Sequence, residues 1–342
     1  MLTMAPKYAK DQPAGFTNHI ERVAVIGAGG SVGKRITTEL LKTGKHTVTA
    51  ISRKDSNTPL PDGAKVVRVD YEDEDSVVAA LEGHQFLVIS LAVNAPQDLE
   101  SRIIKAAGRA EIPYIMPNTY GGDLTNETLM KEIVIGAGYM KATSAIEATG
   151  AQWVALACGF WYEHSLTCGE PWFGFDFPKK QVTFYDEGTT KINVSTWEQC
   201  GRAVAALLSL PELPQDSSDS SPTLSTWANK PLFIDSFIVS QQDMLESWLR
   251  VSGDKRKDWT IVNEPTKARW ARGMKLLQKG DFTGIGLLMY ARAFYPNGDG
   301  LYSEKHGLAN EVLGLPKEDL DERTANAKAM MDRGYHYFGN RN

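Results

Sequence analysis

Short runs of β-branched and apolar residues alternate with longer helical patterns through the first half of the chain. From residue 22 onwards, segments in which apolar residues recur every second position alternate with segments in which they recur about every 3.6 positions. This alternation predicts right-handed βαβ units around a parallel sheet. The expected strands are residues 22–26, 46–52, 65–69, 85–92, 114–117 and 152–157. The expected helices are residues 31–43, 73–81, 97–110 and 138–148.

The pattern is less regular after residue 158. Two short apolar runs, 181–185 and 191–195, look like a hairpin, and 231–239 looks like one more strand. The segment 214–226 is rich in Ser, Asp and Pro and lacks an apolar face, which predicts a solvated, disordered-looking loop. The rest is helical in pattern, with expected helices at residues 199–209, 241–251, 266–279, 282–294 and 316–332.

The composition is that of a folded, water-soluble chain. Hydrophobic residues make up 42% of the sequence and charged residues 23%, which excludes disorder of the whole chain. The net charge is −5 and no segment concentrates basic residues, so neither nucleic acid nor an anionic membrane is expected as a partner. Apolar stretches fall far short of the roughly 20 residues that span a bilayer. Together with the lack of a secretory signal, this favours the cytoplasm.

Several common kinds of site are not supported by the sequence. Cys158, Cys168 and Cys200 show neither CxxC spacing nor a nearby histidine cluster, so we expect no metal site and no disulfide framework. The thiols are expected to be reduced and mostly buried. A Gly-x-Ser-x-Gly elbow and a Walker lysine are also lacking, which disfavours hydrolase and phosphoryl-transfer chemistry.

A glycine-rich segment joins the first expected strand to the first expected helix. In VAVIGAGGSVG, residues 23–33, Gly27 suits a tight turn, Gly30 allows close approach of a pyrophosphate, and Gly33 allows helix–strand packing. Free N–H groups at the helix start, including those of Ser31 and Val32, can bind phosphate. Because strand, turn, helix and second strand occur in the required order, the segment predicts a dinucleotide-binding Rossmann domain.

The end of the second expected strand favours NADP(H) over NAD(H). An acidic residue there would bind the ribose 2′-hydroxyl, but the sequence reads Ile-Ser-Arg-Lys at residues 51–54. Arg53 and Lys54 stand where a 2′-phosphate would lie, and arginine can donate paired hydrogen bonds to it. Asp70 and Tyr71, in the acidic run after the third strand, are candidates for contact with the adenine.

These residues are similar to the NmrA-like and isoflavone-reductase-like branch of the atypical short-chain dehydrogenases, particularly its fungal members. The similarity spans about residues 20–210. The motifs that carry it are GAGGSVG (27–33), SRK (52–54), MPNTYGGD (116–123), AIEATGAQW (145–153) and CGFWYE (158–163). The resemblance implies NADP(H) binding. Reductases of this family transfer hydride to small phenolic or polyketide-like compounds, whereas non-enzymatic members sense the nucleotide and bind another protein.

The resemblance also implies a catalytic lysine eleven residues before the glycine that is Gly150 here. That position holds Tyr139, and the nearest lysine, Lys141, lies two residues later, turned by about 200° around the helix. Three alternatives follow: a shifted helix start brings Lys141 into the site, Tyr139 donates the proton, or the activity has been lost. Reduction requires hydride from the nicotinamide and a proton from a positioned acid.

Further site residues are expected at the carboxyl ends of the strands, where doubly wound sheets bind ligands. Tyr120 follows the fifth strand and is expected to touch the nicotinamide or the substrate. The resemblance of CGFWYE to the family's Gly-Phe-Phe or Gly-Phe-Trp segment implies an aromatic wall beside the nicotinamide. The residues expected along the cofactor are Leu91, Ala92, Asn118, Thr119 and Phe160.

Together, these features predict an α/β, doubly wound parallel-sheet Rossmann fold with a smaller, mainly helical C-terminal region. We expect a flexible leader at residues 1–20, an NADP-binding domain at 21–158 and a substrate-binding or lid region at 159–342. The favoured function is an NADPH-dependent reductase of a small apolar metabolite of secondary metabolism, acting on a carbonyl or activated C=C bond as a monomer or homodimer. The alternative is a non-catalytic NADP(H)-sensing regulator that binds a partner protein.

Overall fold

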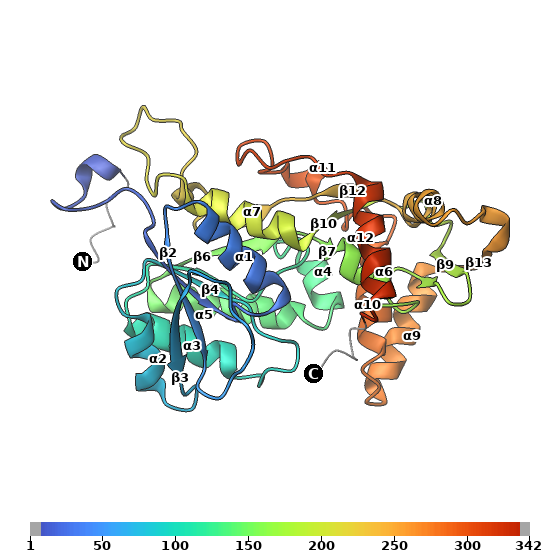
Figure 1. Ribbon diagram of the computed structural model, residues 1–342, viewed down its shortest axis with the longest axis horizontal. Helices are drawn as coiled ribbons and strands as arrows, with labels where there is room; N and C mark the ends of the chain where they lie inside the picture. The colour runs from blue at the N-terminus through green and yellow to red at the C-terminus, as the bar shows by residue number, and fades with distance from the viewer. Residues whose placement is uncertain (1–7, 336–342) are drawn as a thin grey trace.

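A seven-stranded parallel sheet forms the centre of the first half of the molecule (Figure 1). The structure is a computed structural model that describes residues 8–335. The order of strands across the sheet is β11-β6-β5-β4-β1-β2-β3, and every neighbouring pair is parallel. The strands are β1 (Arg22–Ile26), β2 (Thr47–Arg53), β3 (Lys65–Val69), β4 (Phe86–Ile89), β5 (Tyr114–Met116), β6 (Gln152–Ala157) and β11 (Lys230–Phe233).

The order of the strands reverses direction at β1. From β1 the chain moves outward to β2 and β3, then crosses back to β4 on the other side of β1, where Val25 pairs with both Ala50 and Val88. In open α/β sheets the ligand lies outside the carboxyl ends of the strands at such a reversal. The fold therefore places a ligand site beyond the ends of β1 and β4.

Helices cover both faces of the sheet, because alternate residues of each strand point to opposite sides. Val23 and Val25 of β1 face one apolar core, whereas Ala24 and Ile26 face the other. The first core lies against α1 (Ser31–Lys42) and α7 (Trp197–Leu208). The second core lies against α2 (Glu74–Leu81), α3 (Leu99–Arg109) and α5 (Gly136–Thr149). The doubly wound fold class predicted from the sequence is confirmed.

The C-terminal half is mainly helical and surrounds a third core rich in aromatic side chains. Figure 1 shows it on the right of the molecule, against the carboxyl ends of the parallel strands. Two short sheets stabilise it, with strand orders β12-β10-β7 and β13-β9-β8. The strands are β7 (Phe160–Trp161), β8 (Phe175–Asp176), β9 (Gln181–Tyr185), β10 (Ile192–Ser195), β12 (Phe237–Val239) and β13 (Thr260–Glu264).

The remaining helices of the described chain connect these sheets. The α-helices are α4 (Glu127–Glu132), α6 (Tyr162–Thr167), α8 (Gln241–Ser252), α9 (Thr266–Gln278), α10 (Gly284–Ala293), α11 (Ser303–His306) and α12 (Leu320–Asp332). Three short 3-10 helices lie at Ala9–Asp11, Leu224–Trp227 and Arg256–Asp258. No helix within residues 8–335 has both the length and the apolar character needed to cross a membrane.

Two predictions for the C-terminal half are wrong in their pairing. The runs 181–185 and 191–195 form strands, but β9 pairs with β8 and β13, whereas β10 pairs with β7 and β12. The expected single strand 231–239 is divided into β11 and β12, since the amide of Ser236 donates to Val194 O and turns the chain into a different sheet. Side-chain alternation predicts an extended chain, but it does not say which strand will be the partner.

Two segments outside the expected Rossmann range contribute to that half of the molecule. β11 completes the sheet next to β6, and α7 packs against α1 across the first core. The segment 214–226 carries a fully buried Leu224, and Pro214 O accepts a hydrogen bond from the amide of Ala9. Residues far along the chain therefore close the outer edge of the parallel sheet.

Candidate cofactor and active site

The glycine-rich turn is closed by backbone contacts that leave no room for side chains at two positions. Gly27 has φ +83°, and a Cβ there would overlap the carbonyl oxygen of Ser90. A Cβ on Gly33 would overlap the carbonyl oxygen of Gly27. Gly30 directly precedes α1, and its amide donates to Gly27 O over 2.9 Å. The turn thus brings the start of α1 close to the end of β1, as the sequence predicts.

The first turn of α1 suits a negatively charged ligand. No side chain caps this helix at Gly30, and its first turn contains no acidic residue. The first intrahelical bond to the turn runs from the amide of Lys34 to Gly30 O, which leaves the amides of Ser31 and Val32 without helical partners. Unpaired N–H groups and the positive end of the helix dipole together favour phosphate. The residues present therefore fit the pyrophosphate of a dinucleotide.

Two cationic side chains lie at the end of β2. Within the described residues, Lys54 forms an ion pair, whereas Arg53 does not. Arg53 is exposed and makes no ion pair with any residue that the structure describes. Lys54 donates to Asp70 Oδ2 over 2.6 Å, and this hydrogen bond and the two charges raise the pKa of Lys54 and lower the pKa of Asp70. Burial raises the pKa of Tyr71 to about 12, and the nearby charge of Arg53 partly opposes this effect. Arg53 is the group left free to meet an anion here.

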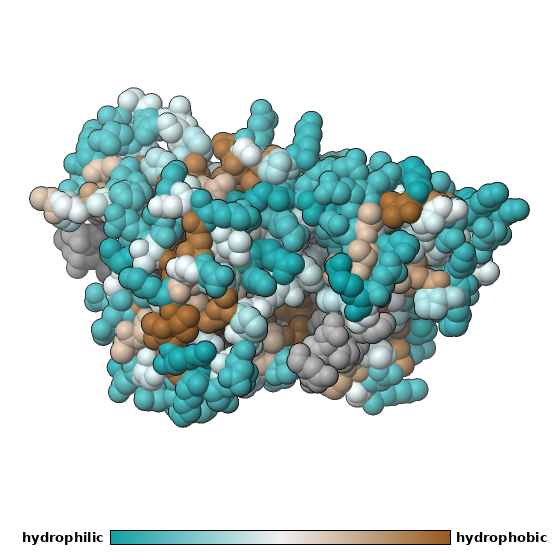
Figure 2. All heavy atoms as spheres, viewed as in Figure 1, coloured by the Kyte–Doolittle hydropathy of each residue, from teal (hydrophilic) through white to brown (hydrophobic). Residues whose placement is uncertain are grey.

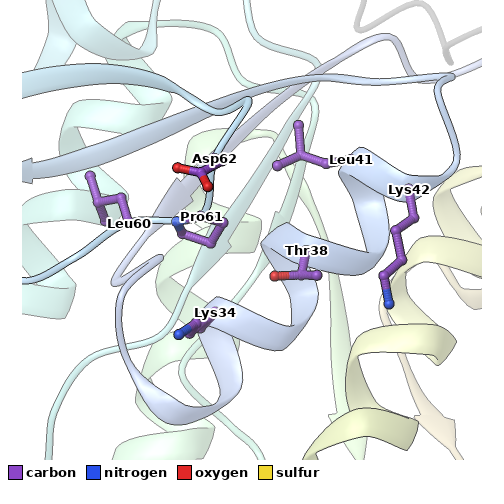
Figure 3. A pocket seen from close by; sticks show the side chains of 7 residues that line it. All are labelled: Lys34, Thr38, Leu41, Lys42, Leu60, Pro61 and Asp62. Atoms are coloured by element: carbon purple, nitrogen blue, oxygen red, sulfur yellow. The ribbon is translucent and has the colours of Figure 1, made fainter.

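The loop after β2 packs on the glycine-rich turn. Thr58 lies so close to Gly29 that a Cβ on that glycine would meet its methyl group. The guanidinium of Arg68 in β3 donates to the carbonyls of Arg53 and Ser56, which holds the loop in place. A groove lies between this loop and α1 (Figure 3), and it contains none of the residues predicted to bind the cofactor. Its lining consists of Lys34, Thr38, Leu41, Lys42, Leu60, Pro61 and Asp62.

The ends of β4 and β5 are joined by one asparagine. Asn118 Oδ1 accepts from the amide of Leu91 over 3.0 Å, and the amide of Asn118 donates to Glu100 Oε1 over 2.7 Å. Burial raises the pKa of Glu100, although the bond from Asn118 opposes this effect. Thr119 is buried, and its hydroxyl has no partner within the described chain. The structure thus brings Leu91, Asn118 and Thr119 together, while Ala92 begins the exposed loop that follows.

Two tyrosines lie behind these strand ends. The hydroxyl of Tyr120 donates to Ile89 O over 2.9 Å, and burial raises its pKa well above the usual value. Tyr139 lies in the first turn of α5 and packs beside the glycine turn after Tyr120, where a Cβ on Gly121 would be 3.5 Å from the hydroxyl of Tyr139. Burial also raises the pKa of Tyr139, and its hydroxyl has no hydrogen-bond partner within residues 8–335. Tyr139 therefore keeps a proton that it can donate.

Lys141 does not lie beside Tyr120 and Tyr139. It is exposed, whereas Ala142, Thr143 and Ile146 are buried residues of the same helix. Two helical residues turn the side-chain direction by about 200°, so Lys141 points away from the face that carries Tyr139. Of the three candidate catalytic residues, Tyr120 and Tyr139 lie together and Lys141 lies apart.

Phe160 belongs to an aromatic wall of the C-terminal half. Its ring stacks on that of Tyr290 with centroids 3.8 Å apart, and it meets Phe173 edge to face. Trp172 also contacts Tyr290, with centroids 5.1 Å apart, and both Phe160 and Trp172 remain partly exposed. Figure 2 shows apolar surface in a hollow between the two halves of the molecule. The aromatic wall contributes apolar rings to the half that faces the strand ends.

Residues that the sequence analysis missed hold the loop that carries Tyr120. His306 Nε2 lies 2.7 Å from Asp123 Oδ2, and Asn126 donates to Asp299 Oδ1 over 2.8 Å. Arg292 pairs with Asp299 and with Glu132. Although burial opposes ionisation, hydrogen bonds from Lys305 and Arg292 lower the pKa of Asp299 to about 2. These partners are far apart in the sequence, and no local pattern indicates them.

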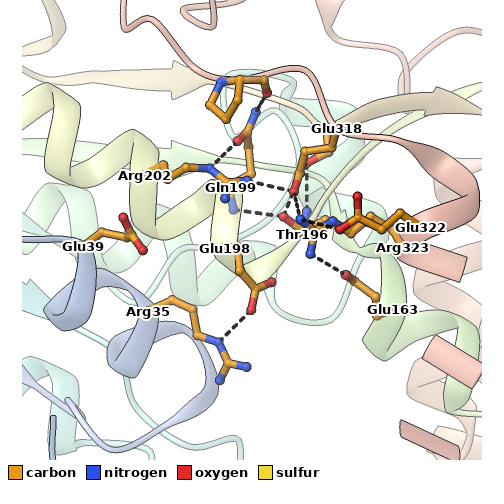
Figure 4. Close-up of polar contacts among 12 residues, drawn as sticks. Arg35, Glu39, Glu163, Thr196, Glu198, Gln199, Arg202, Glu318, Glu322 and Arg323 are labelled. Carbon is orange, nitrogen blue, oxygen red and sulfur yellow. Dashed lines mark hydrogen bonds and ion pairs between the residues drawn. The ribbon is translucent and has the colours of Figure 1, made fainter. Parts of the chain in front are cut away.

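A second polar cluster joins α1 to the C-terminal helices (Figure 4). Arg35 on α1 pairs with Glu198 on α7 over 3.2 Å. Glu318 accepts from Thr196, Arg202 and Arg323. Burial raises the pKa of the adjacent Glu163 to about 8, and Arg323 Nη1 lies 3.8 Å from its carboxyl group. Glu318 thereby links α7, which packs against α1, to α12 of the C-terminal half.

Residues 27–169 match a protein-family model described as NAD(P)H-binding. The chain is 28% identical over 308 residues to the oxidoreductase aprR of Aspergillus flavus, and the match covers 88% of this chain and 96% of that protein. A solved isoflavone reductase superimposes with a TM-score of 0.69 at 17% identity, covering 90% of this chain and 99% of the other. AtPrR2, solved with NADP+ and (+)pinoresinol, gives a TM-score of 0.65 at 16% identity and covers 91% and 100%.

These comparisons confirm the resemblance that the motifs carry. The chain contains an NAD(P)H-binding domain, it has the isoflavone-reductase-like fold, and the relatives that it matches over most of its length include fungal proteins named as oxidoreductases. They support an NAD(P)H-binding oxidoreductase and give no support to the alternative of a non-catalytic regulator.

Proposed function

We propose that this protein is an NADPH-dependent reductase that transfers hydride to a carbonyl or activated C=C bond of a small, ring-bearing apolar metabolite. The observation that carries the proposal is the hydroxyl of the partly buried Tyr139, which has no hydrogen-bond partner within residues 8–335 and lies beside the strand ends, where a Rossmann domain holds the reactive end of its cofactor. A proton donor at this position is what reduction by a nicotinamide requires.

The preference for NADPH over NADH rests on Arg53. Its exposed guanidinium has no ion pair within the described chain, and the neighbouring Lys54 is held by Asp70. Arginine matches a phosphate with paired donors, whereas the ribose hydroxyl of NADH would leave this charge unmatched. Asp70 is engaged with Lys54, so it does not offer NADH a free acceptor.

The proton comes from Tyr139 rather than from Lys141 in this proposal. Bound NADPH would supply the hydride. The raised pKa keeps the hydroxyl of Tyr139 protonated until a stronger base, such as the oxygen of a reduced carbonyl, forms within reach. The hydroxyl of Tyr120 is committed to Ile89 O, so its role is to hold the loop after β5 against the end of β4.

The aromatic wall supports a substrate with an aromatic or conjugated ring. Phe160 and Trp172 are partly exposed, and both are fixed by contacts with Tyr290. Fixed rings provide apolar surface at little cost in conformational entropy, and they favour flat partners. The solved neighbour AtPrR2 has a structure with (+)pinoresinol, which supports a phenolic or polyketide-like substrate for this chain.

The test compares Tyr139→Phe with Lys141→Met. Oxidation of NADPH is followed by absorbance with a panel of quinones, aromatic ketones and phenolic enones, and NADPH affinity is measured separately. Tyr139→Phe should reduce turnover roughly 100- to 10,000-fold while leaving NADPH affinity intact. Lys141→Met should turn over like the wild type. Loss of turnover in Lys141→Met alone would move the proton donor to the lysine, and failure of the wild-type protein with the whole panel would contradict the reductase.

A further inference from the structure

Glu100 is a partly buried acid at the strand ends to which the proposed reaction gives no role. It lies in the first turn of α3, and its Oε1 accepts a hydrogen bond from the amide of Asn118 over 2.7 Å. The side chain of Asn118 in turn accepts from the amide of Leu91. These bonds fix Glu100 where the ends of β4 and β5 meet, beside the place where a Rossmann domain holds the reactive end of its cofactor.

No cation within residues 8–335 pairs with Glu100. Other buried acids of the chain do have such partners. Asp299 pairs with Arg292 over 2.6 Å, and Glu318 pairs with Arg202 over 2.8 Å. Burial raises the pKa of Glu100, and a carboxyl without a neighbouring cation takes up a proton more readily than one in an ion pair. Its Oε2 has no hydrogen-bond partner among the described residues, so this oxygen is free to bind and release a proton.

A short turn connects the group that holds Glu100 to the proposed proton donor. Asn118 bonds to Glu100, and Gly121, three residues later, packs against Tyr139, whose hydroxyl would lie 3.5 Å from a Cβ on that glycine. Three residues span at most about 10 Å. Burial raises the pKa of Tyr139, and the negative charge of Glu100 raises it further. The carboxyl and the phenol therefore lie near each other at the same strand ends.

Tyr139 must regain a proton after each donation. Burial removes its hydroxyl from water, as the raised pKa indicates, so bulk solvent does not replace the proton directly. Glu100 is partly exposed and can exchange protons with solvent. A carboxyl is a much stronger acid than a phenol, so transfer from Glu100 to a Tyr139 phenolate is favourable. Two such groups exchange a proton directly or through one bridging water.

We propose that Glu100 returns a proton to Tyr139 after each turnover, a role that rests on the proposed reductase reaction. In this step the O–H bond of the Glu100 carboxyl breaks and the O–H bond of Tyr139 forms. The carboxylate then takes up a proton from solvent. No electrons are transferred in the step, so it needs no oxidant or reductant.

The experiment compares the first turnover of Glu100→Gln with its later turnovers. The variant loses the acidic proton but keeps an oxygen that can accept from the amide of Asn118, so NADPH affinity should not change. Tyr139 begins protonated, so one equivalent of NADPH per site should be oxidised at the wild-type rate. Later turnovers should be roughly tenfold slower or more, because reprotonation of Tyr139 then limits the rate. Rapid mixing with the panel substrate that the wild type reduces fastest, followed by NADPH absorbance, measures both phases.

Two controls separate proton return from a structural role. Asp98→Asn removes an exposed carboxylate from the same end of α3, where it pairs with Arg102, and this variant should turn over like the wild type. A small buffer acid such as imidazolium, added at constant pH, should speed the slow phase of Glu100→Gln and leave the wild type unchanged. A residue that only holds Asn118 in place would not respond to the buffer.

The outcomes distinguish failure of this role from failure of the proposed function. If Glu100→Gln matches the wild type in every turnover while Tyr139→Phe is inactive, proton return by Glu100 is refuted and Tyr139 remains the donor. Equal slowing of the first and later turnovers, or a slow phase that buffer acids do not change, would also refute it. Full activity of Tyr139→Phe would remove the proposed donor itself, and the role of Glu100 with it.

Discussion

The two halves of the molecule are built by different kinds of contact. The cofactor half is organised by backbone geometry within short stretches of chain, as β1, the glycine-rich turn, α1 and β2 all lie within residues 22–53. The C-terminal half depends on side chains that meet across long intervals. Asn126 and Asp299 are separated by 173 positions, and Arg292 and Glu132 by 160. A site formed by the backbone of one short segment can be predicted from the sequence. A site formed by side chains from distant segments cannot.

The cores differ in the same way. The two cores against the parallel sheet are mainly aliphatic, while the C-terminal half contains many buried rings and two almost fully buried arginines, Arg269 and Arg292. Removal of one partner from such a buried ion pair is costly, because the remaining charge has no solvent to replace it. The stability of the C-terminal half should therefore fall when one charged side chain is removed. The stability of the cofactor half should fall when a side chain is added at a closely packed glycine.

The largest effect is expected from Gly27→Ala. The added Cβ would overlap the carbonyl oxygen of Ser90 at a residue with φ +83°, so the variant should lose more than about 3 kcal/mol of stability. NADPH binding should be lost with it. Thermal unfolding and titration with NADPH measure both quantities.

Gly44→Ala is the matched control for this prediction. Gly44 also has a positive φ, +65°, but no atom lies within 4 Å of the position that a methyl group would take there. The substitution should cost only about 1 kcal/mol and leave NADPH binding unchanged. If Gly27→Ala and Gly44→Ala lost similar amounts of stability, the positive φ alone would explain the loss, and the overlap with the carbonyl oxygen of Ser90 would not be needed.

Asp299→Asn should have the next largest effect and act on the other half. It removes one of the two carboxylates that pair with the buried Arg292 and weakens the hydrogen bond that Asn126 donates, at an expected cost of about 2 kcal/mol. Turnover should fall while NADPH affinity is retained, because the glycine-rich turn is untouched. Asp281→Asn, at an exposed turn with Thr283, should change neither quantity. An equal loss of NADPH affinity in Asp299→Asn would contradict the separation of the two halves.

Glu163→Gln should give an effect that depends on pH. Burial raises the pKa of Glu163 from 4.5 to about 8, so the folded protein holds a proton that the unfolded chain releases. The stability of the wild type relative to Glu163→Gln should be greatest below pH 4.5, fall as pH rises, and level off above pH 8. Each pKa unit of this shift corresponds to about 1.4 kcal/mol, so the variant should gain several kcal/mol relative to the wild type across this range. Urea unfolding at several pH values measures it, and parallel profiles for the two proteins would refute the raised pKa.

The sequence predicted the cofactor half of the fold well. The strands at residues 22–26, 65–69 and 152–157 have the predicted bounds, and the doubly wound fold and NAD(P)H-binding domain are confirmed. In the other half, β13 and α11 were missed, and the pairing of β9 and β10 was wrong. Local pattern specifies whether a segment is extended, but strand partners depend on contacts from elsewhere in the chain.

Some residues of the candidate site could be predicted from local sequence, and others could not. Gly27, Gly30 and Gly33 could be read from spacing, because each position has a backbone requirement. The choice between Tyr139 and Lys141 could not, since it depends on which face of α5 meets the strand ends. Asp123 and Asp299 carried no signal, because their partners His306 and Asn126 lie far away in the sequence. The roles of all these residues in cofactor binding and catalysis stay predictions.

The most direct test of the account is a calorimetric titration of the wild-type protein and Arg53→Ala with NADPH and with NADH. The account predicts tighter binding of NADPH than of NADH by the wild type. Arg53→Ala should weaken NADPH about 10- to 100-fold, the equivalent of a lost charge-assisted hydrogen bond, and barely change NADH. Equal affinity of the wild type for both nucleotides, or equal weakening of both in Arg53→Ala, would contradict the assignment of Arg53 to the 2′-phosphate.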